Sequence, residues 1–236
     1  MPPEFDVGSA CQQLSRAAGR WRNTSVTERA ELARRTAQSV GGESDAWVRA
    51  AVAMKSLGPD GRDSCTDHLR SVLWAEECAT GPIATLRLLF ITAQALQSID
   101  RTGVPEVSVR PRMTHRQNEI VESPFGSPST FVAVDVLPEC RLYDSTIFRG
   151  HQATVRCANP GSVEAFMRLW REECRPGTNA PGVAVVLGAG NVTGLAAADA
   201  VSQIFEQGRA VLLKLHPVQK SLVPVLRSAL NPLVEA

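Results

Sequence analysis

A stretch of about thirty residues constrains the fold more than any other part of the chain. "GVAVVLG" (182–188) is an uninterrupted apolar and β-branched run, typical of a parallel strand buried on both faces. A glycine-containing turn follows, and then "LAAADAVSQIFEQG" (195–208), in which apolar residues recur at helical spacing before a closing glycine. "RAVLLKLH" (209–216) is a second apolar run. Strand, helix and strand in this order predict a βαβ unit with two parallel strands.

The turn after the first predicted strand has features of an anion-binding site. Gly188 and Gly190 lack a Cβ, so a ligand can approach the backbone closely, and free N–H groups at a helix start favour a pyrophosphate. Lys214 is expected at the carboxyl end of the second strand, where open α/β sheets bind ligands. The spacing is one residue longer than G-x-G-x-x-G, so glycines that serve only a tight turn are an alternative.

The first hundred residues predict helices. Ser25 and Glu28 have the spacing of a capping box, and the apolar stripe that follows is expected to end at Gly41. On the predicted helical face of residues 195–208 we expect Leu195, Ala198, Val201, Ile204 and Phe205. Further helices are expected around Trp47–Met54 and Leu69–Leu73, from Pro82 onward, over 163–170 after a cap at Ser162, and over residues 219–236.

Between residues 103 and 160 the chain becomes rich in Pro, Gly and Ser, with short apolar runs at Val107 and Val109 and over residues 131–136. With residues 151–157 as a partner strand, this segment predicts an antiparallel β ribbon that covers a sheet edge or joins subunits, or a surface hairpin. The predicted regions are therefore 1–102 (helical), 103–160 (ribbon) and 161–236 (a partial Rossmann-like βαβα unit), in an α/β protein.

Charge distribution, hydropathy and cysteine spacing argue against a nucleic-acid partner, a membrane span and a metal site. The 25 basic and 24 acidic side chains are spread evenly, which argues against a nucleic-acid partner. No leader pattern is present, and the apolar run "LRLLFITAQAL" is short and contains Arg87, so we expect no membrane span, a cytoplasmic location and reduced thiols. Cys65, His68 and Cys78 lack a fourth ligand, so no metal site is expected.

The segments "LGAGNV", "AAADAVSQIFEQG" and "VLLKLHP" resemble the cofactor-binding segment of the aldehyde dehydrogenase superfamily. The interval from Asn191 to Lys214 is similar to that of the family, and so is a helical amino-terminal part followed by a β ribbon. The resemblance covers most of the chain, although only residues 185–217 are specific. It implies the amino-terminal, cofactor-side half of an oxidoreductase of the aldehyde dehydrogenase or acyl-CoA reductase type, which would use NAD or NADP and form oligomers.

The resemblance also implies roles for individual residues. Asn191 would donate its amide N–H to the oxyanion that develops in the reaction. Lys214, with His216 nearby, would hold the adenosine ribose. Leu187, Gly188, Ala189 and Gly190 would line the nicotinamide side of the cofactor.

The chain departs from the family pattern in three places. The usual Pro-Trp-Asn is Ala-Gly-Asn, a later Pro is replaced by Thr193, and Pro217 stands where many members carry a Glu. No motif supplies the nucleophilic Cys or the general-base Glu, so we expect a truncated form that is inactive unless a second chain completes it. The alternative is a non-catalytic pseudoenzyme or a remnant that binds a partner. An unrelated NADP dehydrogenase is a weaker alternative, since the only tyrosine, Tyr143, has no lysine four residues later.

Overall fold

The computed structural model describes residues 6–57, 61–105, 131–137, 141–158, 163–174 and 182–236. These residues fall into two units. The first joins residues 1–97 to residues 176–236, and the second spans residues 98–175. The sequence predicted three consecutive regions, 1–102, 103–160 and 161–236. Contacts place residues 1–97 of the first and residues 176–236 of the last in one unit, because the amino-terminal helices pack against the carboxyl-terminal ones.

Helix α1 (Val7–Arg22) opens the first unit and was not predicted. Helix α2 (Val26–Lys55) begins at the predicted capping box, in which Glu28 N donates to Ser25 Oγ at 3.2 Å and Ser25 N donates to Glu28 Oε2 at 2.8 Å. The predicted end at Gly41 is wrong, because α2 continues through it. Val40 and Trp47 on either side are fully buried, and their packing outweighs the roughly 1 kcal/mol that a helical glycine costs relative to alanine.

The next elements form one continuous helical run. Helix α3 (Asp67–Cys78) passes through a π-turn, η1 (Ala79–Ile83), into α4 (Ala84–Thr102). The prediction that Pro82 starts a new helix is therefore wrong. Pro82 has no N–H, and its ring would collide with a carbonyl one turn earlier, so the wider π-turn accommodates it inside the run.

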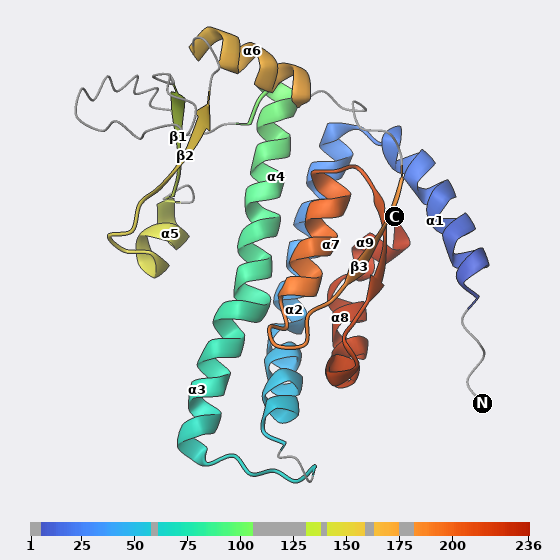
Figure 1. Ribbon diagram of the computed structural model, residues 1–236, viewed down its shortest axis with the longest axis vertical. Helices are drawn as coiled ribbons and strands as arrows, with labels where there is room; N and C mark the ends of the chain where they lie inside the picture. Colours follow the sequence, from blue (N-terminus) through green and yellow to red (C-terminus); the bar gives the residue numbers. More distant parts are fainter. Residues whose placement is uncertain (1–5, 58–60, 106–130, 138–140, 159–162, 175–181) are drawn as a thin grey trace, which may run out of the picture. The chain divides into compact units, whose positions relative to one another are not determined.

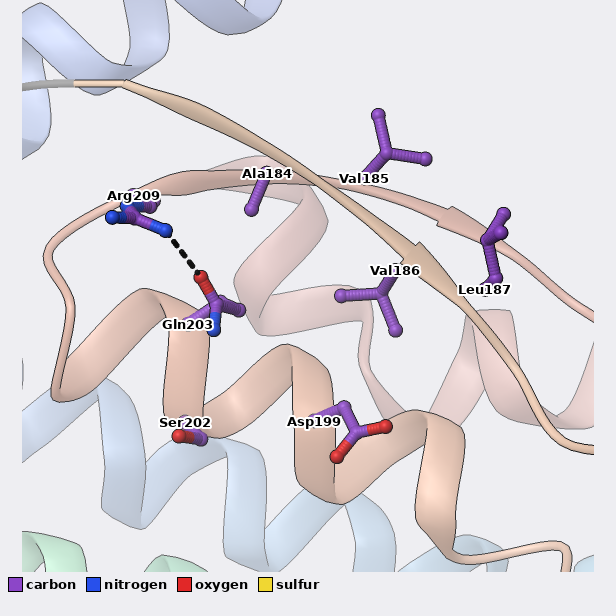
Figure 2. A pocket seen from close by; sticks show the side chains of 8 residues that line it. All are labelled: Ala184, Val185, Val186, Leu187, Asp199, Ser202, Gln203 and Arg209. Carbon is purple, nitrogen blue, oxygen red and sulfur yellow. Dashed lines mark hydrogen bonds between the residues drawn. The ribbon is translucent and has the colours of Figure 1, made fainter.

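The predicted βαβ unit is confirmed. Strand β3 (Val183–Leu187) pairs in parallel with β4 (Ala210–Lys214), and α7 (Leu195–Phe205) connects them. The expectation of burial on both faces is wrong for β3. Val186 is 7% exposed on the α7 side, but Val185 and Leu187 on the opposite face are 61% and 70% exposed (Figure 2). Among the described residues one crossover helix, α7, connects the two strands and covers one face of the pair, so Val185 and Leu187 on the other face stay exposed.

The face that helix α7 turns to the core is predicted only in part, since Val201 and Phe205 are buried as expected and Ile204 packs against the core. Leu195 is 42% exposed and Ala198 is half-buried, although both were expected on the buried side. The buried face instead consists of Ala196, Ala197, Ala200, Val201 and Phe205. Alanine is suited to the start of this face because Ala196 lies close to the backbone of Gly188 after β3.

The carboxyl-terminal segment contains three short helices instead of the single helix predicted. They are the 3-10 helix η2 (Pro217–Leu222), α8 (Val223–Ala229) and α9 (Asn231–Glu235). Pro224 and Pro232 each lie in the first turn of a helix, where a missing N–H costs nothing, so each proline begins a new helix.

One hydrophobic core holds the first unit together, and the helices α2, α4, α7 and α8 that contribute to it are labelled in Figure 1. It combines residues of α2, α4, α7, η2 and α8, including Ala33, Val40, Trp47, Leu89, Val201, Leu222 and Leu226. Helix α1 joins it through Trp21, whose Nε1 donates to the Ile204 carbonyl at 2.9 Å and whose ring meets the Phe205 ring edge-on at 5.6 Å. Helix α2 therefore packs against the carboxyl-terminal helices η2, α8 and α9, while α1 packs against the two strands of the βαβ unit.

The second unit contains the predicted antiparallel ribbon. Strand β1 (Phe131–Leu137) pairs with β2 (Ala153–Ala158), with Val134 opposite Val155. Helix α5 (Arg141–Ile147) was not predicted, whereas α6 (Val163–Glu173) was, with Phe166 and Trp170 rings 5.3 Å apart. The predicted strand at Val107 and Val109 and the predicted cap Ser162 lie outside the described residues.

By length and composition alone, one helical run in the described part of the chain is long and apolar enough to cross a membrane. It is Asp67–Thr102, and a third of its most apolar window is buried inside the protein. The run is longer than the apolar stretch that the sequence singled out, because the π-turn joins α3 to α4. Leu89, Ala93 and Leu96 on this run belong to the core, which is the pattern of a core helix.

Candidate functional site

The candidate site lies where the two parallel strands of the first unit end. Leu187, the last residue of β3, pairs with Lys214, the last residue of β4. The ladder continues one step further, since Gly188 N donates to the Lys214 carbonyl at 2.8 Å. The turn after β3 and the segment after β4 therefore lie side by side, and the fold brings Leu187, Gly188 and Lys214 together.

Contacts within the protein account for both glycines of this turn. A Cβ on Gly188 would lie 3.0 Å from the Cβ of Ala196 at the start of α7. A Cβ on Gly190 would lie 2.9 Å from Nδ1 of His216. Close packing of helix, strand and imidazole thus requires both glycines whether or not a ligand binds.

His216 has a structural role that the sequence did not suggest. It caps η2, and its Nδ1 accepts a hydrogen bond from the backbone N–H of Val218 at 3.2 Å. When the ring is neutral, its proton is therefore on Nε2. Because the ring also covers Gly190, His216 joins the two segments of the site.

The polar residues proposed to meet a ligand are accessible. Asn191 and Lys214 are both exposed, while Ala189 and Gly190, which precede Asn191 in the turn, are half-buried. The accessible part of the turn therefore runs from Leu187 to Asn191, with Lys214 on the adjacent strand.

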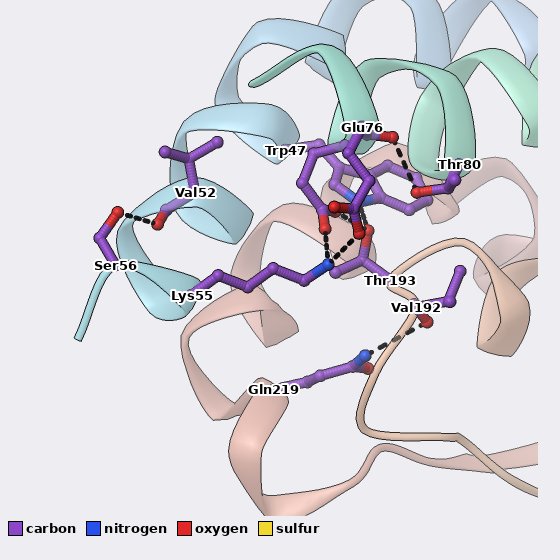
Figure 3. A network of polar contacts seen from close by, with 10 residues as sticks. Trp47, Val52, Lys55, Ser56, Glu76, Thr80, Val192, Thr193 and Gln219 are labelled. Carbon is purple, nitrogen blue, oxygen red and sulfur yellow. Dashed lines mark hydrogen bonds and ion pairs between the residues drawn. The ribbon is translucent and has the colours of Figure 1, made fainter. Parts of the chain in front are cut away.

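The other end of the same turn is buried in a polar network (Figure 3). The Thr193 hydroxyl donates to Glu77 Oε2 at 2.6 Å, and Trp47 Nε1 donates to the Thr193 hydroxyl at 3.1 Å. All three side chains are fully buried. The network thus ties the turn to α2 and α3, two helices that are distant in sequence.

Lys55 at the end of α2 balances the buried carboxylate. Its Nζ forms an ion pair with Glu77 and a second one with Glu76 at 2.7 Å. Partial burial of Lys55 disfavours its charged form, but the hydrogen bonds and charges of the two glutamates outweigh this, so the pKa of Lys55 is raised. Glu77 is therefore a buried charge that is paired and hydrogen-bonded, as such groups must be.

The π-turn and the glycine turn interlock. A Cβ on Gly194 would overlap the Thr80 carbonyl oxygen and lie 3.1 Å from that of Gly81. In the other direction, a Cβ on Gly81 would lie 3.1 Å from Thr193 Oγ1 and 3.2 Å from Trp47 Nε1. Protein atoms therefore crowd the start of α7, where we had expected room for an anion.

A buried glutamine completes the support of the turn. The Gln219 side chain is fully buried and donates from Nε2 to the Val192 carbonyl at 3.4 Å, while its backbone N–H donates to the His216 carbonyl at 2.8 Å. No sequence pattern predicted a supporting role for the five residues Trp47, Lys55, Glu77, Thr193 and Gln219. Two signals were available, since Lys55 is one of only three lysines and Thr193 replaces an expected proline.

A groove of about 450 Å³ lies beside the site, along the unpaired edge of β3 (Figure 2). Its lining is Ala184, Val185, Val186, Leu187, Asp199, Ser202, Gln203 and Arg209. Apart from Leu187, it contains none of the residues of the candidate site. The chemistry predicted at the strand ends is therefore on an open surface and not in this groove.

Within the described residues, no group of three His, Cys, Asp or Glu side chains could hold a metal ion. Cys11, Cys65, Cys78 and Cys174 are free thiols, and burial raises the pKa of Cys78 and Cys174. None of these four belongs to the βαβ unit. Comparison with protein-family models, with curated proteins and with solved structures finds no match.

Proposed function

We propose that the first unit is the NAD- or NADP-binding half of an oxidoreductase similar to aldehyde dehydrogenases. The observation that carries the proposal is the hydrogen bond from Gly188 N to the Lys214 carbonyl, which sets the start of the turn beside Lys214 at the carboxyl ends of two parallel strands. Open parallel sheets bind nucleotides at this end. The exposure of Asn191 and Lys214 supports it, since both side chains are free to meet a ligand.

The residues present fit such a cofactor at the accessible part of the turn. Lys214 would donate from Nζ to the adenosine ribose, with His216 beside it, and the backbone of Leu187, Gly188, Ala189 and Gly190 would line the nicotinamide side. Asn191 would donate from its amide to the oxyanion that forms on a carbonyl substrate. When bound, the cofactor would accept or supply a hydride.

The site is open and incomplete in this unit. The groove of the unit is lined mainly by other residues, and none of the described cysteines belongs to the βαβ unit. A nucleophile and a base for aldehyde chemistry would therefore come from a second chain, which would also cover the open side of the turn.

The test is calorimetric titration of the purified chain with NAD and with NADP. Saturable binding of either one that is lost in Lys214→Ala is the expected result. Lys220→Ala is the matched control, because Lys220 is also exposed but belongs to η2. Equal affinity in wild type and Lys214→Ala, or no binding by a folded wild-type chain, would contradict the proposal.

A second candidate function is that of a non-catalytic protein that binds a partner through its sheet. The crowding of the α7 start by Thr80 and Gly81 favours it, because this packing leaves little room for a pyrophosphate. So does the exposed apolar face of β3. A folded chain that binds neither NAD nor NADP would support this second function.

A further inference from the structure

The edge of β3 that faces away from β4 is open. In the described part of the chain, β3 pairs only with β4, so alternate N–H and C=O groups along its other edge have no strand partner. Val185 and Leu187 at this edge are largely exposed, and the groove of about 450 Å³ runs beside them. An exposed apolar strand edge is a template for pairing with another strand.

The wall of this groove is polar and carries opposite charges at its two ends (Figure 2). Arg209 lies near the amino end of β3 and donates from Nη1 to Gln203 Oε1 at 3.3 Å. Asp199 projects from α7 near Val186, toward the carboxyl end of the strand. A parallel strand buried on both faces needs an apolar wall. A strand that docks in this groove would therefore need to bring a carboxylate to the Arg209 end and a cation to the Asp199 end.

We propose that β3 pairs antiparallel with β3 of a second copy of this chain, which gives a continuous four-stranded sheet. A two-fold axis beside Val185 would place that residue opposite its own copy and Val183 opposite Leu187. The same axis brings Asp199 of each copy to the end of the groove that holds Arg209 of the other. The edge is therefore self-complementary both in its apolar pairs and in its charges.

The size of this interface sets the strength of the dimer. Two five-residue strands and their flanking side chains bury less than the roughly 1,200 Å² of a standard interface, so a dissociation constant on the order of 100 µM is expected. Exposed ion pairs are screened by salt, so the dimer should weaken as ionic strength rises. Nucleotide binding plays no part in this association, so the two proposals can fail separately.

Sedimentation velocity of the full chain over a range of concentrations tests the proposal. The wild type should shift from monomer toward dimer as concentration rises. Asp199→Arg and Arg209→Asp should each weaken the dimer at least tenfold, because each places like charges across the axis. The double variant exchanges the charges and should restore the dimer. Arg227→Asp, an exposed reversal on α8, should leave it unchanged.

A second variant tests the strand itself. Val185→Lys should abolish the dimer, since it sets two ammonium groups opposite each other at the axis, while Leu195→Lys on α7 should not. Circular dichroism would establish that both variants fold. The proposal is overturned if the wild type stays monomeric at about 1 mM, well above the expected constant. It is equally overturned if the charge reversals and Val185→Lys leave dimerisation intact.

Discussion

The turn after β3 has two ends with opposite character. From Leu187 to Asn191 it is exposed or half-buried. Two residues later, Thr193 and Gly194 are fully enclosed and held by Glu77, Trp47 and the π-turn. One short segment thus combines an accessible end with an immobilised end.

The difference indicates that the two ends of the turn contribute unequally to the stability of the fold. The buried end fixes the turn against helices α2 and α3, whereas the accessible end is held through Gly188 and Gly190 and leaves the Asn191 side chain exposed. Substitutions at the buried end should therefore reduce the free energy of unfolding, and substitution of the exposed Asn191 should leave it unchanged.

The largest effect is expected for Gly194→Ala. Its Cβ would overlap the Thr80 carbonyl oxygen, a backbone atom that cannot rotate away, so a loss of at least about 3 kcal/mol in the free energy of unfolding is expected. Urea denaturation measures it. Gly41→Ala is the control, because nothing lies within 4 Å of its Cβ in the helix, and it should stabilise by about 1 kcal/mol. Similar stabilities of the two variants would contradict the interlocked turns.

Lys55→Met should follow in magnitude. It removes the cation that balances Glu77 and leaves a carboxylate buried with one remaining hydrogen-bond donor, at a cost of about 3 kcal/mol. Lys220→Met is the matched control, since Lys220 is exposed, and a change of less than about 0.5 kcal/mol is expected for it. Equal losses of unfolding free energy in Lys55→Met and Lys220→Met would mean that the ion pair of Lys55 with Glu77 does not stabilise the fold.

The same pair predicts a dependence on alkaline pH. Because the folded-state pKa of Lys55 is raised, its contribution to stability is complete below the unfolded-state pKa, about 10.4, and is lost as pH rises through the higher folded-state value. Unfolding free energies of wild type and Lys55→Met should therefore converge above that window. A constant difference between them from pH 8 upward would contradict this assignment.

Thr193→Val should have a moderate effect. The substitution keeps the shape but removes the acceptor of Trp47 Nε1 and the donor to Glu77, which costs about 2 kcal/mol. A double-mutant cycle with Trp47→Phe isolates their coupling. Additive losses in the cycle would show that the hydrogen bond between Trp47 and Thr193 contributes little.

The smallest effect is expected for Asn191→Ala. Its side chain is exposed, so the free energy of unfolding should change by less than about 0.5 kcal/mol. Thermal denaturation beside Thr193→Val provides the comparison. A large loss of stability in Asn191→Ala would mean that the accessible end is structural as well, and the division between the two ends would not hold.

Much of the fold could be predicted because its signals are local. The capping box of Ser25 and Glu28, the parallel pair β3 and β4, and the ribbon of β1 and β2 follow from patterns within a few residues. The ends of elements were predicted less well. Gly41 and Pro82 are local helix breakers, and contacts with distant residues override both of them.

The sequence by itself determined the order of strand, turn, helix and strand, and with it the meeting of Gly188 and Lys214 at one end of the sheet. Periodicity and chain geometry suffice for that. Only the tertiary structure decided that Gly190 makes room for His216, that Gly194 makes room for Thr80, and that Lys55 balances Glu77 beneath Thr193. These pairs are separated by many residues along the chain, and no local pattern encodes which side chains packing will bring into contact.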